Sequence, residues 1–370
     1  MRFFIFRFRG GSILAKKIMV SIKDCKPKMI IAETVYNDYG AVVVWENTVL
    51  NRLTLMQLEN IGIDYLYVYE QETDESMDAK ISEQKLPGQA PDDSFLQSYE
   101  KDKSDIKTLL LDLSEGETGS IENVLDIANS VYARNEQNMD IINCITQIRN
   151  VDEYTYYHCI NVSMLAMLIG KWLQLEPIDI HMLVQAGLLH DVGKSLIPGS
   201  IIKKPAKLTE NEYEKVKKHS QYGYYLTKRL NRFDNRILEA ILYHHEREDG
   251  SGYPRGLNRD QIPLFAKIVA VADTYDAMTA NRVYKPKQTP FKVFDMMQNS
   301  CFGYLDPVVL NTFLSNISHY YTGSVVKLND GRIAEVVYIN YMQYGKPVLK
   351  IGDEYIDLMV RKNLKIEAII

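Results

Sequence analysis

The sequence predicts a mainly helical protein, in which a helical bundle is flanked by a small N-terminal α+β module and a small C-terminal β-barrel-like module. Between residues 106 and 321, apolar residues recur every three or four positions, which is the spacing of amphipathic helices. Before residue 70 and after residue 322, short β-branched and aromatic runs alternate with turn-forming residues. With 370 residues, of which 46% are hydrophobic, the chain can bury a large core in two or three domains.

The composition excludes several classes of partner. A net charge of −5 gives no general attraction to a nucleic acid polymer or an anionic membrane, so a phosphate site must be a local basic cluster. The apolar runs of the Phe- and Arg-rich first residues are too short for a membrane span or a secretory signal. Four scattered cysteines without a CxxC pair favour reduced thiols and a cytoplasmic location.

Residues 1–70 are predicted to form the small α+β module. The runs Ala41–Trp45 and Leu66–Tyr69 predict strands, and Leu53–Asn60 has the spacing of a short helix. This part of the sequence contains no nucleophile motif, metal-ligand cluster or glycine-rich phosphate loop, so we expect a regulatory or docking role. Residues 71–105 are polar and acidic, which predicts a linker whose last part could already be helical.

Five predicted helices of the bundle carry an apolar stripe that runs into a histidine or an aspartate. These residues are His158, the pair His190-Asp191, His219, the pair His244-His245, and Asp273 with Asp276. A single buried histidine is more often a hydrogen-bonded core residue than a metal ligand. Five of the seven histidines, however, are expected on inner faces, where their buried ring nitrogens need a partner. Two divalent cations would be such partners. His181 and His319 fit no such pattern and are expected to be incidental.

Two stretches strengthen this interpretation. His190-Asp191-Val192-Gly193-Lys194 combines an imidazole, a carboxylate and a cation at the inner end of a buried helix. In His244–Pro254, adjacent histidines precede a loop with two glycines and a Tyr-Pro pair, which can bend back over bound metals.

The last segment, residues 322–370, returns to β structure. Ser324–Leu328 and Arg332–Ile339 flank Asn329-Asp330-Gly331, which predicts a hairpin, and three further strands are expected before the end. We expect a barrel-like module without catalytic residues, which could dock on the helical domain or help to form a homodimer.

These separated motifs resemble those of the HD-GYP phosphodiesterases, which hydrolyse the second messenger cyclic di-GMP. The resemblance covers about residues 154–310 and rests on His158–Val162, His190–Lys194, His219, His244–Pro254, Asp273–Lys285 and Gly303–Pro307. It implies that residues 106–321 are an HD-type catalytic domain with a binuclear metal centre.

The resemblance also implies a role for each matching residue. The metal ligands would be His158, His190, Asp191, His219, His244, His245 and Asp273, with Asp191 bridging the two ions. The substrate would be bound by Lys194, Gly252, Tyr253, Arg282 and Lys285. Two metals would share a hydroxide that attacks phosphorus, with Asp191 and Lys194 as the catalytic groups. Arg282 and Lys285 would hold the second phosphate, although the alternative for both is a solvated helix end.

The expected number of metals follows from one departure from the family pattern, and their expected identity follows from the chemistry of the ligands. Family members with three metals carry a carboxylate one turn before the first histidine, where this chain has Tyr154, and Glu153 should point away from the ligand face. We therefore expect two metals. Mixed imidazole and carboxylate ligands suit iron or manganese, which the family uses, although Zn, Co or Ni could occupy the site in vitro.

The product is open between linear pGpG and GMP, and two other functions remain alternatives. An HD-type hydrolase of another nucleotide would not need the Gly252-Tyr253-Pro254 loop. A degenerate cyclic di-GMP receptor that signals through a protein partner would be expected to lose ligands or Lys194, and these are all present.

Overall fold

The computed structural model describes two compact units, residues 1–84 and residues 85–370, which we treat separately. The described residues are 17–26, 29–33, 35–36, 42–44, 50, 55, 58, 62–69, 91, 93–115, 123–134, 138–147, 154–202, 204, 206–279, 288–301 and 303–370.

The N-terminal unit contains two small antiparallel sheets. Strand β1 (Lys17–Ser21) pairs with β4 (Tyr65–Tyr69), and β2 (Val35–Tyr36) pairs with β3 (Val42–Val44). Strands β3 and β4 coincide with the β-rich runs of the sequence. In β4, alternate side chains are buried, as in a half-buried sheet. The helix expected at Leu53–Asn60 lies mostly outside the described residues.

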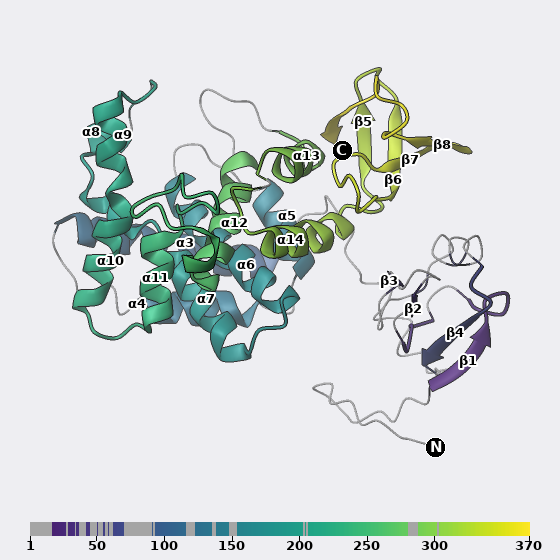
Figure 1. Ribbon diagram of the computed structural model, residues 1–370, viewed down its shortest axis with the longest axis horizontal. Coiled ribbons are helices and arrows are strands. Elements are labelled where there is room, and N and C mark those ends of the chain that lie inside the picture. Colours follow the sequence, from purple (N-terminus) through teal and green to yellow (C-terminus); the bar gives the residue numbers. More distant parts are fainter. Residues whose placement is uncertain are drawn as a thin grey trace. The chain divides into compact units, whose positions relative to one another are not determined.

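The second unit is built mainly from helices, shown in teal and green in Figure 1. They are α3 (Asp93–Glu115), α4 (Asn123–Ala133), α5 (Asn138–Gln147), α6 (Tyr154–Trp172), α7 (Pro177–Leu189), η3 (Val192–Leu196), α8 (Gly199–Ile202), α9 (Glu210–Lys217), α10 (His219–Arg229), α11 (Asn235–Tyr243), η4 (Arg259–Gln261), α12 (Leu264–Thr279), α13 (Pro290–Ser300) and α14 (Pro307–His319). Helix α3 begins at Asp93, inside the segment 71–105 predicted as a linker.

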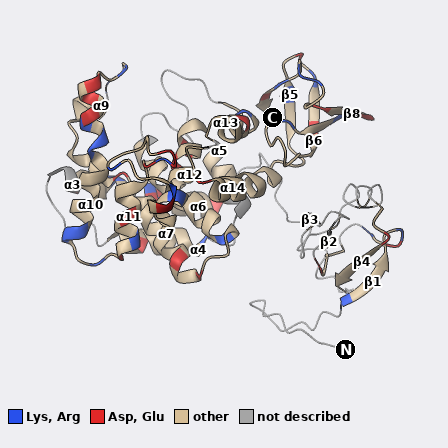
Figure 2. Cartoon of the chain, viewed as in Figure 1, with Lys and Arg blue, Asp and Glu red and all other residues tan. Residues whose placement is uncertain are grey.

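Helices α6 and α7 form the centre of this unit and approach each other closely. Helix α6 is buried along most of its length, and Figure 2 shows few charged residues on it, in contrast to α9. A Cβ atom added at Gly187 would lie 2.5 Å from the Cα of Ser163, so only glycine permits this approach. Because α7 ends at Leu189, the contact fixes where His190 and Asp191 leave the helix.

The C-terminal strands form one open antiparallel sheet, and the predicted barrel-like closure is wrong. Strands β5 (Val325–Leu328), β6 (Ile333–Tyr338), β7 (Val348–Ile351), β8 (Glu354–Asp357) and β9 (Ile366–Ile369) lie in the order β8-β7-β6-β5-β9. Strands β8 and β9 are the two edges of this sheet and do not pair with each other.

The sheet does not need to close on itself because the helices cover its apolar residues. Val326, Val336 and Leu349 belong to the same buried cluster as the helical core. The loop after β6 packs tightly on α13, since a Cβ atom at Gly345 would lie 2.5 Å from the carbonyl oxygen of Phe291. Figure 1 shows the sheet, in yellow, beside α13 and α14. In the part of the chain that the structure describes, no helix has the length and apolar character needed to cross a bilayer.

Candidate metal centre

The structure brings all seven residues expected to bind metal into two neighbouring clusters. The first cluster is His158, His190 and Asp273, and the second cluster is Asp191, His219, His244 and His245. Within each cluster, every residue offers a ligand atom, and these atoms lie within 4.8 Å of one another. They come from α6, the ends of α7 and α11, the start of α10, and α12.

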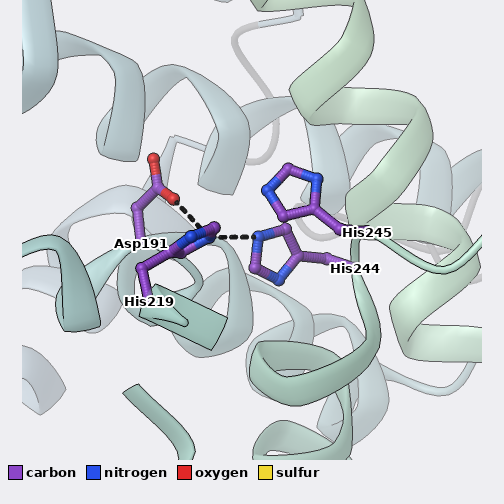
Figure 3. A group of neighbouring side chains, drawn as sticks. All are labelled: Asp191, His219, His244 and His245. Atoms are coloured by element: carbon purple, nitrogen blue, oxygen red, sulfur yellow. Dashed lines mark hydrogen bonds and ion pairs between the residues drawn. The ribbon is translucent and has the colours of Figure 1, made fainter. Parts of the chain in front are cut away.

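The second cluster is drawn in Figure 3. One oxygen of Asp191, Oδ1, lies 3.3 Å from Nε2 of His219, and this nitrogen lies 3.3 Å from Nε2 of His244. The ring of His245 is next to the other two imidazoles, with its centroid 4.1 Å from that of His244 and 5.0 Å from that of His219. The three imidazoles and the carboxylate therefore face one small volume.

The first cluster adjoins the second through Asp191. Nε2 of His158 lies 3.2 Å from Oδ1 of Asp273 and 3.3 Å from Nε2 of His190. The second oxygen of Asp191, Oδ2, lies 3.5 Å from Nε2 of His158 and 3.4 Å from Nε2 of His190. The two oxygens of Asp191 thus face different clusters, which is the geometry that a bridging carboxylate requires.

Backbone carbonyls fix the orientation of three imidazoles. The Nδ1 atoms of His190, His219 and His244 lie 2.7–2.8 Å from the carbonyl oxygens of Gly187, Val216 and Ile241, three residues earlier in each case. A carbonyl accepts only, so Nδ1 carries the ring proton in each neutral imidazole, and the lone pair is on Nε2. All three lone pairs therefore face the clusters, which is the arrangement that metal-binding histidines adopt.

Burial keeps three of the imidazoles, those of His219, His244 and His245, neutral. It lowers the pKa of His219 to about 4 and that of His245 to about 3. Burial and the neighbouring imidazoles lower the pKa of His244 well below its ordinary value. Nε2 of His219 and Nε2 of His244, which lie 3.3 Å apart, are consequently two acceptors facing each other, which is unfavourable unless a cation lies between them.

One oxygen of the Asp191 carboxylate is also without a hydrogen bond. Asp191 is only 3% exposed, and its buried Oδ1 has no hydrogen-bond donor. Such an atom is costly in a protein interior unless a cation or a donor satisfies it. The orphaned oxygen, the inward lone pairs and the mixture of imidazole and carboxylate ligands fit divalent metal ions.

Lys194 lies next to this centre. It is carried by the short helix η3 that follows Asp191, and its ammonium forms an ion pair with Oδ2 of Asp191. Burial alone would lower the pKa of Lys194, but the Asp191 carboxylate outweighs burial and raises it. Although burial acts to raise the pKa of Asp191, Lys194 and the imidazoles hold it well below its usual range. The lysine is therefore charged at the edge of the centre.

The loop after the histidine pair is organised by Glu246. Its buried carboxylate accepts hydrogen bonds from the backbone N–H groups of Arg255 (2.7 Å) and Leu257 (2.8 Å). At Gly252, a Cβ atom would lie 2.4 Å from the backbone at Glu246, so the turn requires glycine for packing. These contacts place the Tyr253 ring 4.7 Å from the ring of His245, at the edge of the second cluster.

Sequence reasoning placed Asp276 on an inner face, but it did not assign the supporting roles that Asp276 and Asn161 have toward the ligands. Asp276 accepts a hydrogen bond from Nδ1 of His158 (2.8 Å), and the Nδ2 of Asn161 donates to the same carboxylate (2.9 Å). The available signal was spacing, since each lies three residues after an expected ligand on the same helical face.

Four of the sequence-based predictions fall on residues or side chains that the structure does not describe. Arg282, Lys285 and Glu153 lie outside the described residues, as does the side chain of Tyr154. His181 is hydrogen-bonded to Asn129 (2.8 Å) away from both clusters.

Comparisons with known proteins agree with this architecture. A family model described as the HD domain matches residues 122–309. A cyclic di-GMP phosphodiesterase of Pseudomonas aeruginosa is 31% identical over 247 residues, which are 67% of this chain and 58% of that protein. A 3′3′-cGAMP-specific phosphodiesterase of Vibrio cholerae is 36% identical over 177 residues, which are 47% of this chain and 41% of that protein.

A solved structure gives the same result for the fold. An HDG"Y"P protein from Bdellovibrio bacteriovorus superposes with a TM-score of 0.51 at 16% identity, covering 82% of this chain and 99% of that one. The chain therefore shares its fold with that protein, while it matches between 41% and 58% of the length of the two curated relatives.

Proposed function

Because the chain belongs to the HD domain family, we propose that it is a metal-dependent phosphodiesterase that hydrolyses cyclic di-GMP to pGpG, to GMP or to both. The observation that carries the proposal is the pair of clusters joined by Asp191. Their inward Nε2 lone pairs and orphaned carboxylate oxygen would bind two divalent ions, for which iron or manganese suits the ligands. The four cysteines, none of which forms a disulfide among the described residues, support a reducing, cytoplasmic location.

The bound ions would supply Lewis acidity that activates a water molecule and offsets charge on the phosphoryl oxygens. His158, His190 and Asp273 would hold one ion, and His219, His244 and His245 the other. Asp191 would bridge them, and its low pKa keeps it ionised for this role.

We assign substrate contacts to Lys194 and Tyr253, which lie beside the clusters. The Lys194 ammonium, which pairs with Asp191 at the edge of the clusters, would stabilise the charge that develops on the phosphoryl group. The Tyr253 ring, held beside His245, offers a face for a guanine. We assign Arg282 and Lys285 to the second phosphate of the dinucleotide on the family resemblance alone, and Gly252 to shaping the loop.

A second substrate is favoured by one specific observation, the relative from Vibrio cholerae that is named for 3′3′-cGAMP. The two cyclic dinucleotides share their phosphates and differ in one base. The ligands and Lys194 therefore do not distinguish between them, and the contacts to the bases would decide.

The test is turnover of cyclic di-GMP and 3′3′-cGAMP by manganese- or iron-loaded protein under reducing conditions, with products separated by chromatography. We expect hydrolysis of cyclic di-GMP by the unaltered chain and by His181→Ala, a control away from the clusters. Asp191→Ala and Lys194→Ala should lose it. Binding without turnover by the unaltered chain would refute the enzyme and favour a receptor, and unchanged turnover in both variants would remove these residues from the mechanism.

A further inference from the structure

A chain of buried hydrogen bonds connects helix α3 to the first cluster. The hydroxyl of Tyr99 on α3 donates to Oδ1 of Asn161 on α6 (2.7 Å), and Nδ2 of Asn161 donates to Oδ1 of Asp276 on α12 (2.9 Å). The other oxygen of Asp276 accepts from Nδ1 of His158 (2.8 Å). Tyr99 and Asp276 are 0% exposed and Asn161 is 2% exposed, so bulk water does not compete for these bonds.

The direction of this chain is fixed by its chemistry. The nitrogen of the Asn161 amide donates to Asp276 and its oxygen accepts from Tyr99, so a partner at each end holds the amide in one orientation. Asp276 in turn requires the proton of His158 on Nδ1, which leaves the Nε2 lone pair facing Asp273. Each bond therefore determines the orientation of the next side chain.

We propose that Tyr99 and Asn161 are positioning residues that hold Asp276, and through it the His158 imidazole, in the orientation that binds metal in the first cluster. The inference rests on the proposed function, because it takes this cluster to be a metal site. Removing the Tyr99 hydroxyl leaves the amide oxygen of Asn161 without its donor inside the core, so the amide is no longer held in one orientation. Loss of such outer partners weakens metal binding by about 10- to 100-fold in known sites.

The first experiment is a calorimetric titration of the metal-free full chain with Mn²⁺. In Tyr99→Phe we expect the Kd of one of the two sites to rise by about tenfold, while the Kd of the other stays unchanged. The matched control is Tyr157→Phe. The Tyr157 ring stacks on Tyr99 with centroids 5.6 Å apart, but its hydroxyl donates to Glu100 (2.8 Å) instead of Asn161. This variant should bind both ions as the unaltered chain does.

Two ligand variants identify the affected site. In His245→Ala, which keeps the first cluster intact, adding Tyr99→Phe should still weaken Mn²⁺ binding by about tenfold. In Asp273→Ala, which removes a ligand of the first cluster, adding Tyr99→Phe should change nothing. A purely structural role of Tyr99 would instead lower both affinities together, and this result would overturn the proposal.

A second variant keeps the proposal testable if Tyr99→Phe folds poorly. Asn161→Ala interrupts the same chain and should raise the Kd of the first cluster by at least as much, with the Tm of the metal-free protein recorded for every variant. For either variant, a loss confined to the first cluster supports the proposal, whereas no loss overturns it. If the unaltered chain binds no divalent ion, the proposed function falls together with this inference; if it binds two and both variants match it, only the inference falls.

Discussion

Gly193→Ala tests whether close backbone contact between η3 and the start of α10 sets the distance between Asp191 and His219 in the second cluster. Gly193 lies between Asp191 and Lys194, and a Cβ atom there would lie 2.0 Å from the carbonyl oxygen of His219 and 2.4 Å from the backbone nitrogen of Gly223. Ordinary contact begins at 3.4 Å, so η3 and the start of α10 must separate by about 1.4 Å.

This displacement should affect both stability and metal binding. Overpacking of this kind costs about 2–3 kcal/mol of unfolding free energy, which corresponds to a fall in Tm of roughly 4–12 °C. The same movement carries His219 away from Asp191, whose facing atoms are 3.3 Å apart. Because a misplacement of about 1 Å can reduce activity about 100-fold, we expect the Mn²⁺ affinity of the second cluster and the rate of hydrolysis to fall together.

The assay compares Gly193→Ala with Gly199→Ala, six residues along the same segment. A Cβ atom at Gly199 meets nothing within 4 Å, so this control adds the same methyl group without a clash. Tm is measured by circular dichroism on metal-free protein and Mn²⁺ affinity by calorimetry. Equal Tm values and equal affinities in the two variants would refute the argument that backbone contact sets the cluster geometry.

Three further predictions concern individual groups. In Lys194→Ala, hydrolysis should fall by about 100- to 1000-fold while equilibrium dialysis still finds two Mn²⁺ per chain; loss of metal would mean that the lysine acts on binding instead. In Glu246→Gln, one oxygen that accepts a backbone N–H becomes a donor, so denaturant unfolding should show a loss of about 1–3 kcal/mol, and an unchanged midpoint would contradict this role. The metal-free protein should lose stability as the pH falls from 6.5 towards 4, because the unfolded chain takes up protons that His219 (pKa about 4) and His245 (pKa about 3) do not bind when folded. Thermal melts in a chelator at pH 7.5 and pH 5 check this, and a higher Tm at pH 5 would show that other groups dominate.

The helical domain could be predicted from the sequence because its signals are local. The apolar stripes and the histidines that end them reflect a period of 3.6 residues, and the structure brings those side chains together. The resemblance to the HD-GYP phosphodiesterases is confirmed by the HD domain match and by the cyclic di-GMP phosphodiesterase among the relatives. The metal-binding and substrate-binding roles of individual residues stay predictions.

Features that depend on distant partners could not be predicted. The strands after residue 322 and the hairpin at Gly331 are local signals, but whether the sheet closes depends on what covers its apolar face. Asp276 likewise resembles one more ligand beside Asp273 when only α12 is considered. Asp276 is instead the acceptor for His158, because α12 lies next to α6. The spacing of residues within one helix does not reveal this contact.

Nδ1 of His158 pairs with a side chain, whereas Nδ1 of His190, His219 and His244 pairs with a backbone carbonyl. The position of each histidine on its helix explains this difference. His190 and His244 are the C-caps of α7 and α11, and His219 follows the end of α9. The last carbonyls of a helix lack an intrahelical donor, so a histidine at this position can donate Nδ1–H to the carbonyl three residues earlier and present Nε2 outward. The same helix ends add partial negative charge that favours a cation. His158 lies in α6 away from its C-terminal end, where carbonyls accept the helical N–H groups four residues later, so its Nδ1 needs an external acceptor. Asp276 supplies it, and its buried carboxylate in turn needs a donor, which is the Asn161 amide that Tyr99 holds.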